Sequence, residues 1–220
     1  MKKYRGEFIE KESSTMFYTY GYLFYIPVNI VYFTVILVYG MKKRKSYSYY
    51  VFSLITAIYI NKAIELVYFP MLLAEEEVWA SIESIRSFMD FSLDFAHMGG
   101  LRQIGGNILL TVPMGLLLPF LFDFSKRILW SCVIMLSCMI EMIQLGMIAV
   151  FHCVSKAFDV KDIILNLAGG LLGLILFEAL AAAVRKVIRP EVKCGFLKYI
   201  YEQCWHFSGG KPGEKARGSA

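Results

Sequence analysis

The sequence predicts an all-α integral membrane protein with about five transmembrane helices and an external amphipathic segment between the second and third helices. Hydrophobic residues make up 57% of the 220 positions, and the mean hydropathy is +0.54. An average soluble domain is only about half apolar. Five apolar runs each approach or exceed the roughly 20 residues that a helix needs to cross about 30 Å of hydrocarbon. They cover residues 17–40, 47–73, 104–122, 128–151 and 163–184.

The first apolar run is too long for the apolar core of a signal peptide, and no small-residue cleavage site follows it. We therefore expect it to be a retained helix. The five cysteines form no CxxC pair, which argues against a disulfide framework and against a zinc site. For such a chain we expect membrane lipids as partners, and neither nucleic acid nor a cofactor.

The distribution of Lys and Arg predicts an outer N-terminus and a cytoplasmic C-terminus. Four basic residues lie in the 41–46 loop, two lie at 126–127 and eight follow from Arg185 onward, whereas the segments assigned to the outer side hold eight. Residues 185–205 are basic and partly apolar, typical of a helix on the anionic cytoplasmic leaflet or of a simple topology anchor. The expected divisions are an external N-terminal segment (1–16), a transmembrane domain (17–184), a cytoplasmic amphipathic segment (185–205) and a flexible tail (206–220).

The acidic segment between the second and third runs, residues 74–103, is too long for a plain loop. Apolar residues recur in it at helical spacing, with Trp79 beside them. This pattern predicts an amphipathic helix lying on the outer surface, and a solvated loop is the alternative. The apolar residues are Ile82, Ile85, Met89, Leu93 and Ala96.

Polar residues recur at helical spacing within the third, fourth and fifth runs. An ionisable side chain at the centre of a lone helix costs roughly 3 kcal/mol on insertion scales. Such side chains must therefore face protein, or water held within protein. The three faces consist of Asn107, Thr111 and Gly115; of Ser137, Glu141 and Gln144; and of Asp159, Asp162, Asn166, Gly169 or Gly170, and Gly173.

Because the polar groups of these faces lie toward the predicted outer ends of their helices, we expect them to line one outward-facing pocket. Gly169 and Gly173 predict close approach of a neighbouring helix. Asp159 also fits a helix cap, and Glu141 and Asn166 also fit interhelical hydrogen bonds. The pattern alone leaves these alternatives open.

The second run carries Asn61, Lys62 and Glu65. Lys62 and Glu65 are three residues apart, so we expect an internal ion pair that faces the bundle. Pairing of Lys62 with Glu141 is the alternative.

Glycines at 99, 100, 105 and 106 surround Arg102 just before the third run. Free N–H groups at a helix start, together with an arginine, can bind an anion, and a glycine-rich hinge is the alternative. No two histidines have the spacing of a metal site, and we assign no metal ligand. The carboxylates and amides of the pocket suit a hard cation such as Mg²⁺ or Ca²⁺, which leaves that possibility open.

Three segments resemble the VanZ-like family of bacterial membrane proteins, whose founding member is associated with resistance to the glycopeptide teicoplanin. They are NILLTVPMGLLLP (107–119), EMIQ (141–144) and FDVKDIILNLAGGLLG (158–173). The resemblance is specific over about 102–177, and it implies a VanZ-like transmembrane domain over 17–184. The family usually has Gly-Arg where this chain has Ser155 and Lys156. A lysine ammonium therefore replaces an arginine guanidinium, which could bind a phosphate or carboxylate with two parallel hydrogen bonds.

The resemblance implies a bacterial plasma membrane and a setting in the cell envelope, in glycopeptide resistance or envelope homeostasis. We expect the pocket to bind the head group of a lipid-linked cell-wall precursor, or the antibiotic. One alternative is an enzyme that hydrolyses or transfers a group on a lipid-linked substrate, with Glu141 as general acid or base and Asp159 or Asp162 as its charged partner. A carrier or flippase is the second alternative. The predicted substrate-binding residues are Arg102, Asn107, Gln144, Lys156 and Asn166.

Overall fold

The computed structural model describes residues 15–80, 82, 84–95, 100–188 and 194–210. Five helices in it are long and apolar enough to cross a membrane, which confirms the predicted fold class of a multi-pass membrane protein. Each begins or ends within a few residues of the corresponding apolar run. They are α2 (Tyr22–Lys42), α3 (Tyr47–Tyr68), α5 (Leu101–Leu121), α6 (Lys126–Phe151) and α7 (Val160–Val187).

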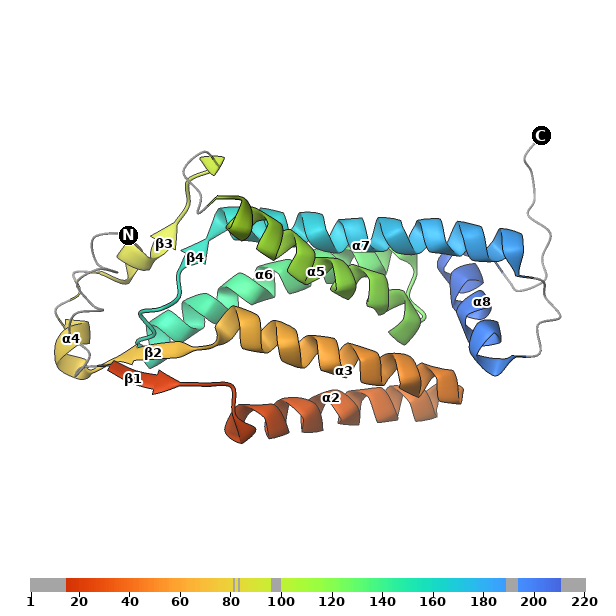
Figure 1. Ribbon diagram of the computed structural model, residues 1–220, viewed down its shortest axis with the longest axis horizontal. Coiled ribbons are helices and arrows are strands. Elements are labelled where there is room, and N and C mark those ends of the chain that lie inside the picture. The colour runs from red at the N-terminus through yellow and green to blue at the C-terminus, as the bar shows by residue number, and fades with distance from the viewer. Residues whose placement is uncertain (1–14, 81, 83, 96–99, 189–193, 211–220) are drawn as a thin grey trace.

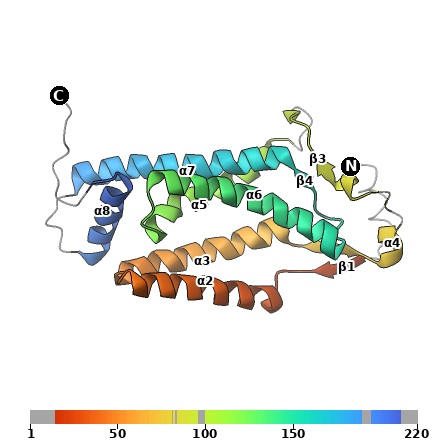
Figure 2. The same cartoon turned by 180° about the vertical axis from the view of Figure 1, so that it is seen from behind.

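The closest packing in the bundle joins α5 and α7, which lie against each other in both views (Figures 1 and 2). Three buried glycines allow it. A Cβ atom at Gly169 would lie 2.2 Å from the Ile108 carbonyl oxygen, and one at Gly173 would lie 2.1 Å from that of Val112. On the other helix, a Cβ at Gly115 would lie 1.9 Å from the Gly170 carbonyl oxygen. The small-residue contact predicted for Gly169 and Gly173 is therefore confirmed.

Helices α2 and α3 form an antiparallel hairpin beside this core (Figure 1). Asn29 of α2 and Asn61 of α3 exchange side-chain hydrogen bonds of 2.9 and 3.0 Å, and Tyr20 donates to the same Asn61 amide. On α3, Tyr59 donates to the Leu110 carbonyl oxygen of α5. Much of the apolar surface of α2 is exposed, as expected for a helix that faces lipid.

At one end of the bundle, short strands pair segments that are far apart in the sequence. β1 (Thr15–Tyr18) pairs antiparallel with β2 (Met71–Ala74), and β3 (Met89–Asp90) pairs parallel with β4 (Phe158–Asp159). Helix α6 ends nearby, and the residue that follows it, His152, has a left-handed backbone (φ 53°) that turns the chain toward β4.

The predicted amphipathic helix between the second and third spans is not confirmed. The described part of this segment contains the short helix α4 (Glu76–Ala80), the 3-10 turn η1 (Ile85–Phe88) and then β3. Met89 has helical spacing in the sequence but lies in a strand, because backbone pairing with β4 determines its conformation. Ala96 lies outside the described residues.

The other end of the bundle carries α8 (Gly195–Phe207), which lies across it (Figures 1 and 2). Tyr199, Cys204 and Phe207 are buried there, and the Tyr199 hydroxyl donates to the Phe120 carbonyl oxygen. Arg185 donates to the Cys204 carbonyl oxygen over 3.1 Å. The amphipathic segment predicted over 185–205 is therefore the end of α7 followed by a helix that packs against the bundle.

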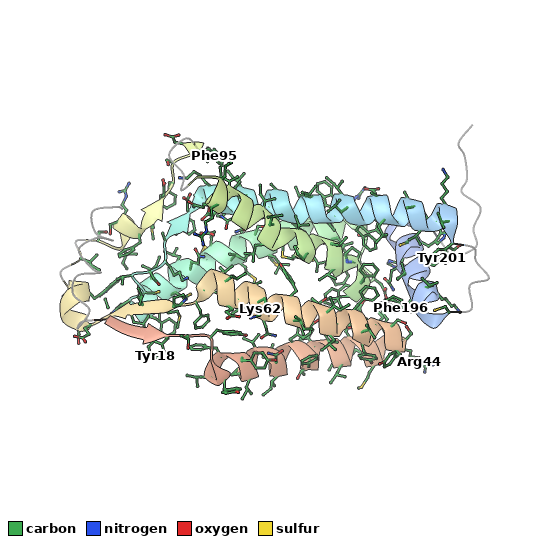
Figure 3. The ribbon with its side chains drawn as sticks, in the orientation of Figure 1. Tyr18, Arg44, Lys62, Phe95, Phe196 and Tyr201 are labelled. Atoms are coloured by element: carbon green, nitrogen blue, oxygen red, sulfur yellow. The ribbon has the colours of Figure 1, made fainter. Side chains whose placement is uncertain are left out.

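The basic segments used to predict orientation gather at this α8 end. Lys45, after α2, binds Asp123, after α5, over 2.5 Å, and Lys126 pairs with Glu178. In Figure 3, Tyr18 lies at the strand end, whereas Arg44, Phe196 and Tyr201 lie at the α8 end. The grouping matches the one expected from the sequence, and the assignment of this end to the cytoplasm remains a prediction. Of the predicted N-terminal segment and tail, residues 1–14 and 211–220 lie outside the described residues.

Candidate functional site

Asp162, in the first turn of α7, receives two amide side chains from α5. Gln103 Nε2 lies 3.1 and 3.3 Å from its two carboxylate oxygens, and Asn107 Nδ2 lies 2.5 Å from Oδ1. Gln103 and Asn107 are four residues apart and so share one face of α5. The glycine contact farther along α5 and α7 holds this face against α7.

Glu141 of α6 lies near the start of α7, where Asp162 is located. Only 1% of this residue is exposed, and its Oε2 accepts the Asp159 backbone N–H over 3.2 Å. Glu141 lies close enough to Asp159 and Asp162 to interact electrostatically with both. The chain thus gathers three carboxylates where α6 and α7 meet.

Asp159 is the N-cap of α7. Its Oδ1 accepts the Lys161 backbone N–H over 2.8 Å, so the capping role considered from the sequence is confirmed. The same oxygen lies 3.2 Å from the Lys161 ammonium. Asp159 therefore combines a structural role with a position beside Glu141.

Lys161 connects the segment between α3 and α5 to this cluster. Its side chain is only 4% exposed, and its ammonium lies 2.6 Å from Asp90 and within 3.3 Å of both oxygens of Ser92. The hydrogen bond from Lys161 lowers the pKa of Asp90 to about 2, from an ordinary 3.8, with help from the Ser92 hydroxyl and backbone. This contact and the β3–β4 pairing hold the segment around Asp90 over the start of α7.

Asn166 lies one turn below Asp162 on the same face of α7. The residue is 1% exposed, and its Oδ1 has no hydrogen-bond partner among the described residues. A buried amide oxygen without a partner costs about 1–3 kcal/mol. A ligand that donates a hydrogen bond would recover that cost.

We name the six residues that these contacts bring together the polar cluster. The three carboxylates and two of the amides were predicted from the sequence, whereas Gln103 was not. The sequence signal for Gln103 was its four-residue spacing from Asn107, which becomes visible only if the helix begins at Leu101 instead of near 104. The polar cluster consists of Gln103, Asn107, Glu141, Asp159, Asp162 and Asn166.

Three predicted binding residues lie outside these contacts. Arg102 is exposed at the start of α5 and makes no hydrogen bond with a described residue, because it lies about 100° around the helix from Gln103. Gln144 is half-buried on α6. Lys156 donates to the Val67 carbonyl oxygen over 3.0 Å, and thus satisfies the last turn of α3. The Arg102 and Lys156 positions give no support to an anion site beside the carboxylates.

Gly100 begins α5 with a left-handed backbone (φ 83°), whereas Gly105 and Gly106 lie within the helix. Among the described glycines around Arg102, Gly100 is therefore the one whose backbone conformation favours glycine.

The ion pair predicted between Lys62 and Glu65 forms, with 2.7 Å between Nζ and Oε2. It does not face the bundle, however. The Lys62 side chain is 70% exposed, so the lysine is not a partner for Glu141. On α3 it is Asn61 that faces α2, so Lys62, the next residue, lies on the exposed face of the helix.

No cluster of metal ligands is found among the described residues. Within residues 15–80, 82, 84–95, 100–188 and 194–210, no three His, Cys, Asp or Glu side chains are arranged to hold a metal ion. Asp162 is already occupied by two amide donors, and Glu141 by a backbone N–H. The arrangement suits a ligand that exchanges hydrogen bonds with carboxylates and amides better than it suits a bare cation.

A family model described as VanZ/LLP1 matches residues 29–181 of the chain. The matched range contains all of α3, α5, α6 and the polar cluster, and nearly all of the contact between α5 and α7. No curated protein and no solved structure shows a significant match to the chain. Because the matched residues span well over half of its length and carry the cluster-forming helices, the protein belongs to the VanZ/LLP1 family.

Proposed function

We propose that the polar cluster binds the head group of a lipid-linked cell-wall precursor, or a glycopeptide antibiotic such as teicoplanin. In this proposal the protein acts in the bacterial plasma membrane, in glycopeptide resistance or envelope homeostasis. The strand end faces outward and the α8 end faces the cytoplasm, in line with the distribution of basic residues.

One observation carries the proposal. The Asn166 amide oxygen is buried without a described partner, one helical turn from Asp162, and Asp162 in turn lies near Glu141. This stretch of α7 therefore presents acceptors that no described donor fills. The complementary ligand presents hydroxyl, amide or ammonium donors. Sugar hydroxyls and peptide N–H groups of a cell-wall precursor or a glycopeptide meet this requirement.

The charge of the cluster indicates which part of the precursor it contacts. Among the described residues, Lys161 is the ammonium that contacts the polar cluster, through Asp159, and Asp90 engages it as well. A phosphate would be repelled there. The proposal therefore assigns the sugar or peptide part of the head group to the cluster and leaves the phosphate outside it.

Binding by the purified protein tests the proposal. In native mass spectrometry, wild type is expected to retain an added lipid-linked disaccharide pentapeptide or teicoplanin. Asp162→Asn is expected to weaken retention about tenfold or more, as for the loss of a hydrogen bond to a charged group. Glu178→Gln is the matched control, because Glu178 lies on the same helix, exposed, and pairs with Lys126 in its other half. Equal retention by all three proteins, or none by wild type, contradicts the proposal.

A second candidate function rests on the burial of Glu141 beside two further carboxylates. Such a group can serve as the general acid or base of an intramembrane hydrolase or transferase that acts on a lipid-linked substrate. Glu141→Gln separates the two functions. It spares retention of the substrate in both, whereas it abolishes formation of a modified product only if Glu141 transfers a proton. The readout is the mass of the precursor after incubation with wild type or variant.

A further inference from the structure

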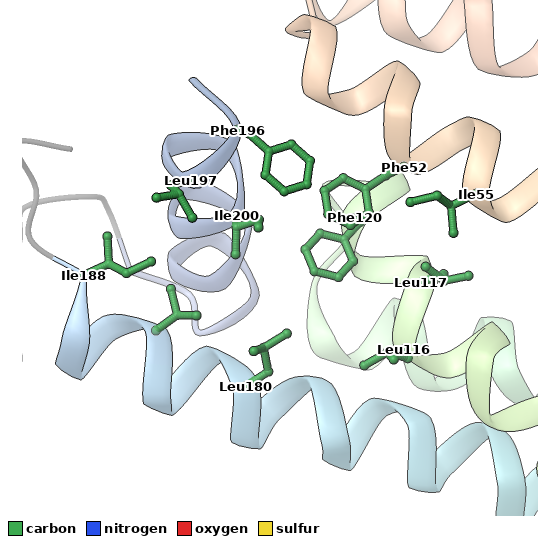
Figure 4. Close-up of a pocket in the computed structure, with 11 residues that line it drawn as sticks. Phe52, Ile55, Leu116, Leu117, Phe120, Leu180, Ile188, Phe196, Leu197 and Ile200 are labelled. Carbon is green, nitrogen blue, oxygen red and sulfur yellow. The ribbon is translucent and has the colours of Figure 1, made fainter. Parts of the chain in front are cut away.

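A cavity of about 390 Å³ lies at the α8 end, opposite to the polar cluster, and shares no residue with it. Helices α3, α5, α7 and α8 surround it (Figure 4). Every residue that lines it is apolar. Phe52 and Phe120 face Phe196 and Ile200 of α8, while Leu117 and Leu180 come from the spans α5 and α7. We call this cavity the α8 groove.

The α8 groove requires an apolar occupant. Its walls on α3, α5 and α7 belong to helices that cross the membrane, and no polar group lines it to hold water. Its volume falls within the range of sites for small ligands, which is roughly 300–1,000 Å³. In a membrane, the abundant apolar molecule of suitable shape is the acyl chain of a phospholipid.

The charges around the groove indicate the head group. Among the described residues at the α8 end, basic side chains outnumber acidic ones, and the acidic ones are engaged in ion pairs. The basic residues are Lys42, Lys43, Arg44, Lys45, Lys126, Arg127, Arg185, Lys186 and Lys198; the acidic residues are Asp123, Glu178 and Glu202.

Arg44 lies in the short loop that joins α2 to α3 at this end. It is exposed and has no ion-pair partner among the described residues. Four residues later, Ser48 donates to the Gly195 carbonyl oxygen at the start of α8, directly before Phe196 of the groove. Figure 3 shows Arg44 and Phe196 at the same end of the molecule. A guanidinium binds a phosphate with two parallel hydrogen bonds.

We propose that the α8 groove holds one acyl chain of an anionic phospholipid whose phosphate contacts Arg44. The lipid comes from the leaflet next to α8, and it completes the packing of α8 against α3, α5 and α7. This site is separate from the polar cluster, and the proposal does not depend on the function proposed for that cluster.

Photo-crosslinking in lipid nanodiscs tests the proposal. The probes are phosphatidylglycerol with a diazirine in one acyl chain and the matched phosphatidylcholine. Phosphatidylglycerol is expected to label α8 and the C-terminal half of α5, which lines the groove. Leu117→Trp fills the groove, and excluding even two methylene groups lowers labelling about tenfold. Leu109→Trp is the control on the same helix, because Leu109 is exposed and outside the groove, and it leaves labelling unchanged.

The head group has its own test. Arg44→Gln is expected to reduce the preference for phosphatidylglycerol over phosphatidylcholine about fivefold. Equal labelling by the two lipids in wild type overturns the anionic head group, and equal labelling of Leu117→Trp and Leu109→Trp overturns the groove as the site. If Leu117→Trp does not fold, Leu180→Trp fills the groove from α7 and replaces it. An unlabelled groove in a dimeric protein identifies a second copy as the occupant and also overturns the proposal.

Discussion

Gly115 is the position where one added methyl group most directly tests the packing of α5 on α7. In Gly115→Ala the new Cβ would lie 1.9 Å from the Gly170 carbonyl oxygen, and real Cβ contacts essentially never fall below 3.0 Å. The helices must therefore separate by about 1.1 Å, the difference between these distances. Both atoms belong to the backbone or are fixed to it, so no side-chain rotation relieves the contact.

The expected cost of Gly115→Ala is about 1–3 kcal/mol, the usual penalty for overpacking. The apparent melting temperature in detergent then falls by roughly 2–4 °C per kcal/mol. A separation of similar size near the start of the helices would also break the bond of 2.5 Å between Asn107 and Asp162. The variant is therefore expected to lose function together with stability.

Gly106→Ala provides the matched control in the same helix. A Cβ at Gly106 meets no atom within 4 Å, and alanine favours a helix interior over glycine by about 0.8–1.0 kcal/mol. We expect its melting temperature to equal or exceed that of wild type. Equal melting temperatures for Gly115→Ala and Gly106→Ala would refute the close backbone contact between α5 and α7.

Three further predictions concern the polar cluster and its surroundings. Asn166→Leu removes a buried acceptor without a described partner, so it should stabilise the protein by about 1–3 kcal/mol while it abolishes ligand retention. A lower melting temperature would show instead that Asn166 stabilises the packing of the helices. Lys161→Met leaves Asp90 and Asp159 without their ammonium and should destabilise the protein by roughly 1–3 kcal/mol. In the same melting experiment the control Lys62→Met, at an exposed site, should change the stability by no more than about 0.5 kcal/mol. Because the folded-state pKa of Asp90 is lowered to about 2, its contribution is fully present above pH 3.8 and is lost as the pH falls through about 2. Melting temperatures of wild type and Asp90→Asn should therefore differ at pH 5 and converge near pH 2, and a constant difference would contradict the Lys161 contact.

The sequence was sufficient to predict the five spans and the close approach of a neighbouring helix at Gly169 and Gly173, although it did not identify that helix as α5. Long apolar runs have few alternatives to transmembrane helices, and Gly169 and Gly173 are spaced to let a neighbouring backbone approach. The same spacing predicted which carboxylates and amides share a face. Asp162 and Asn107 meet because the glycines bring their helices together.

Contacts between distant segments limited the prediction elsewhere. Met89 fits a helical repeat, but β3 pairs with β4, a partner about 70 residues later in the chain. Lys156 appeared free to bind a ligand, but the last turn of α3 supplies it with a carbonyl oxygen. Arg102 and Gln103 are adjacent, and only the start and rotation of α5 decide that Gln103 faces Asp162. Helical spacing identifies a shared face but does not specify what that face contacts.

Glycopeptide susceptibility is the most direct test of a functional polar cluster. A sensitive Gram-positive host should express wild type, Glu141→Gln, Asp162→Asn or the control Glu178→Gln at matched membrane levels. We predict that wild type and Glu178→Gln raise resistance to teicoplanin, with vancomycin tested in parallel. We also predict that Asp162→Asn fails to do so, and that Glu141→Gln fails as well if proton transfer is required. Full protection by both cluster variants would show that these polar residues only hold the helices together, and would contradict the functional role assigned to them.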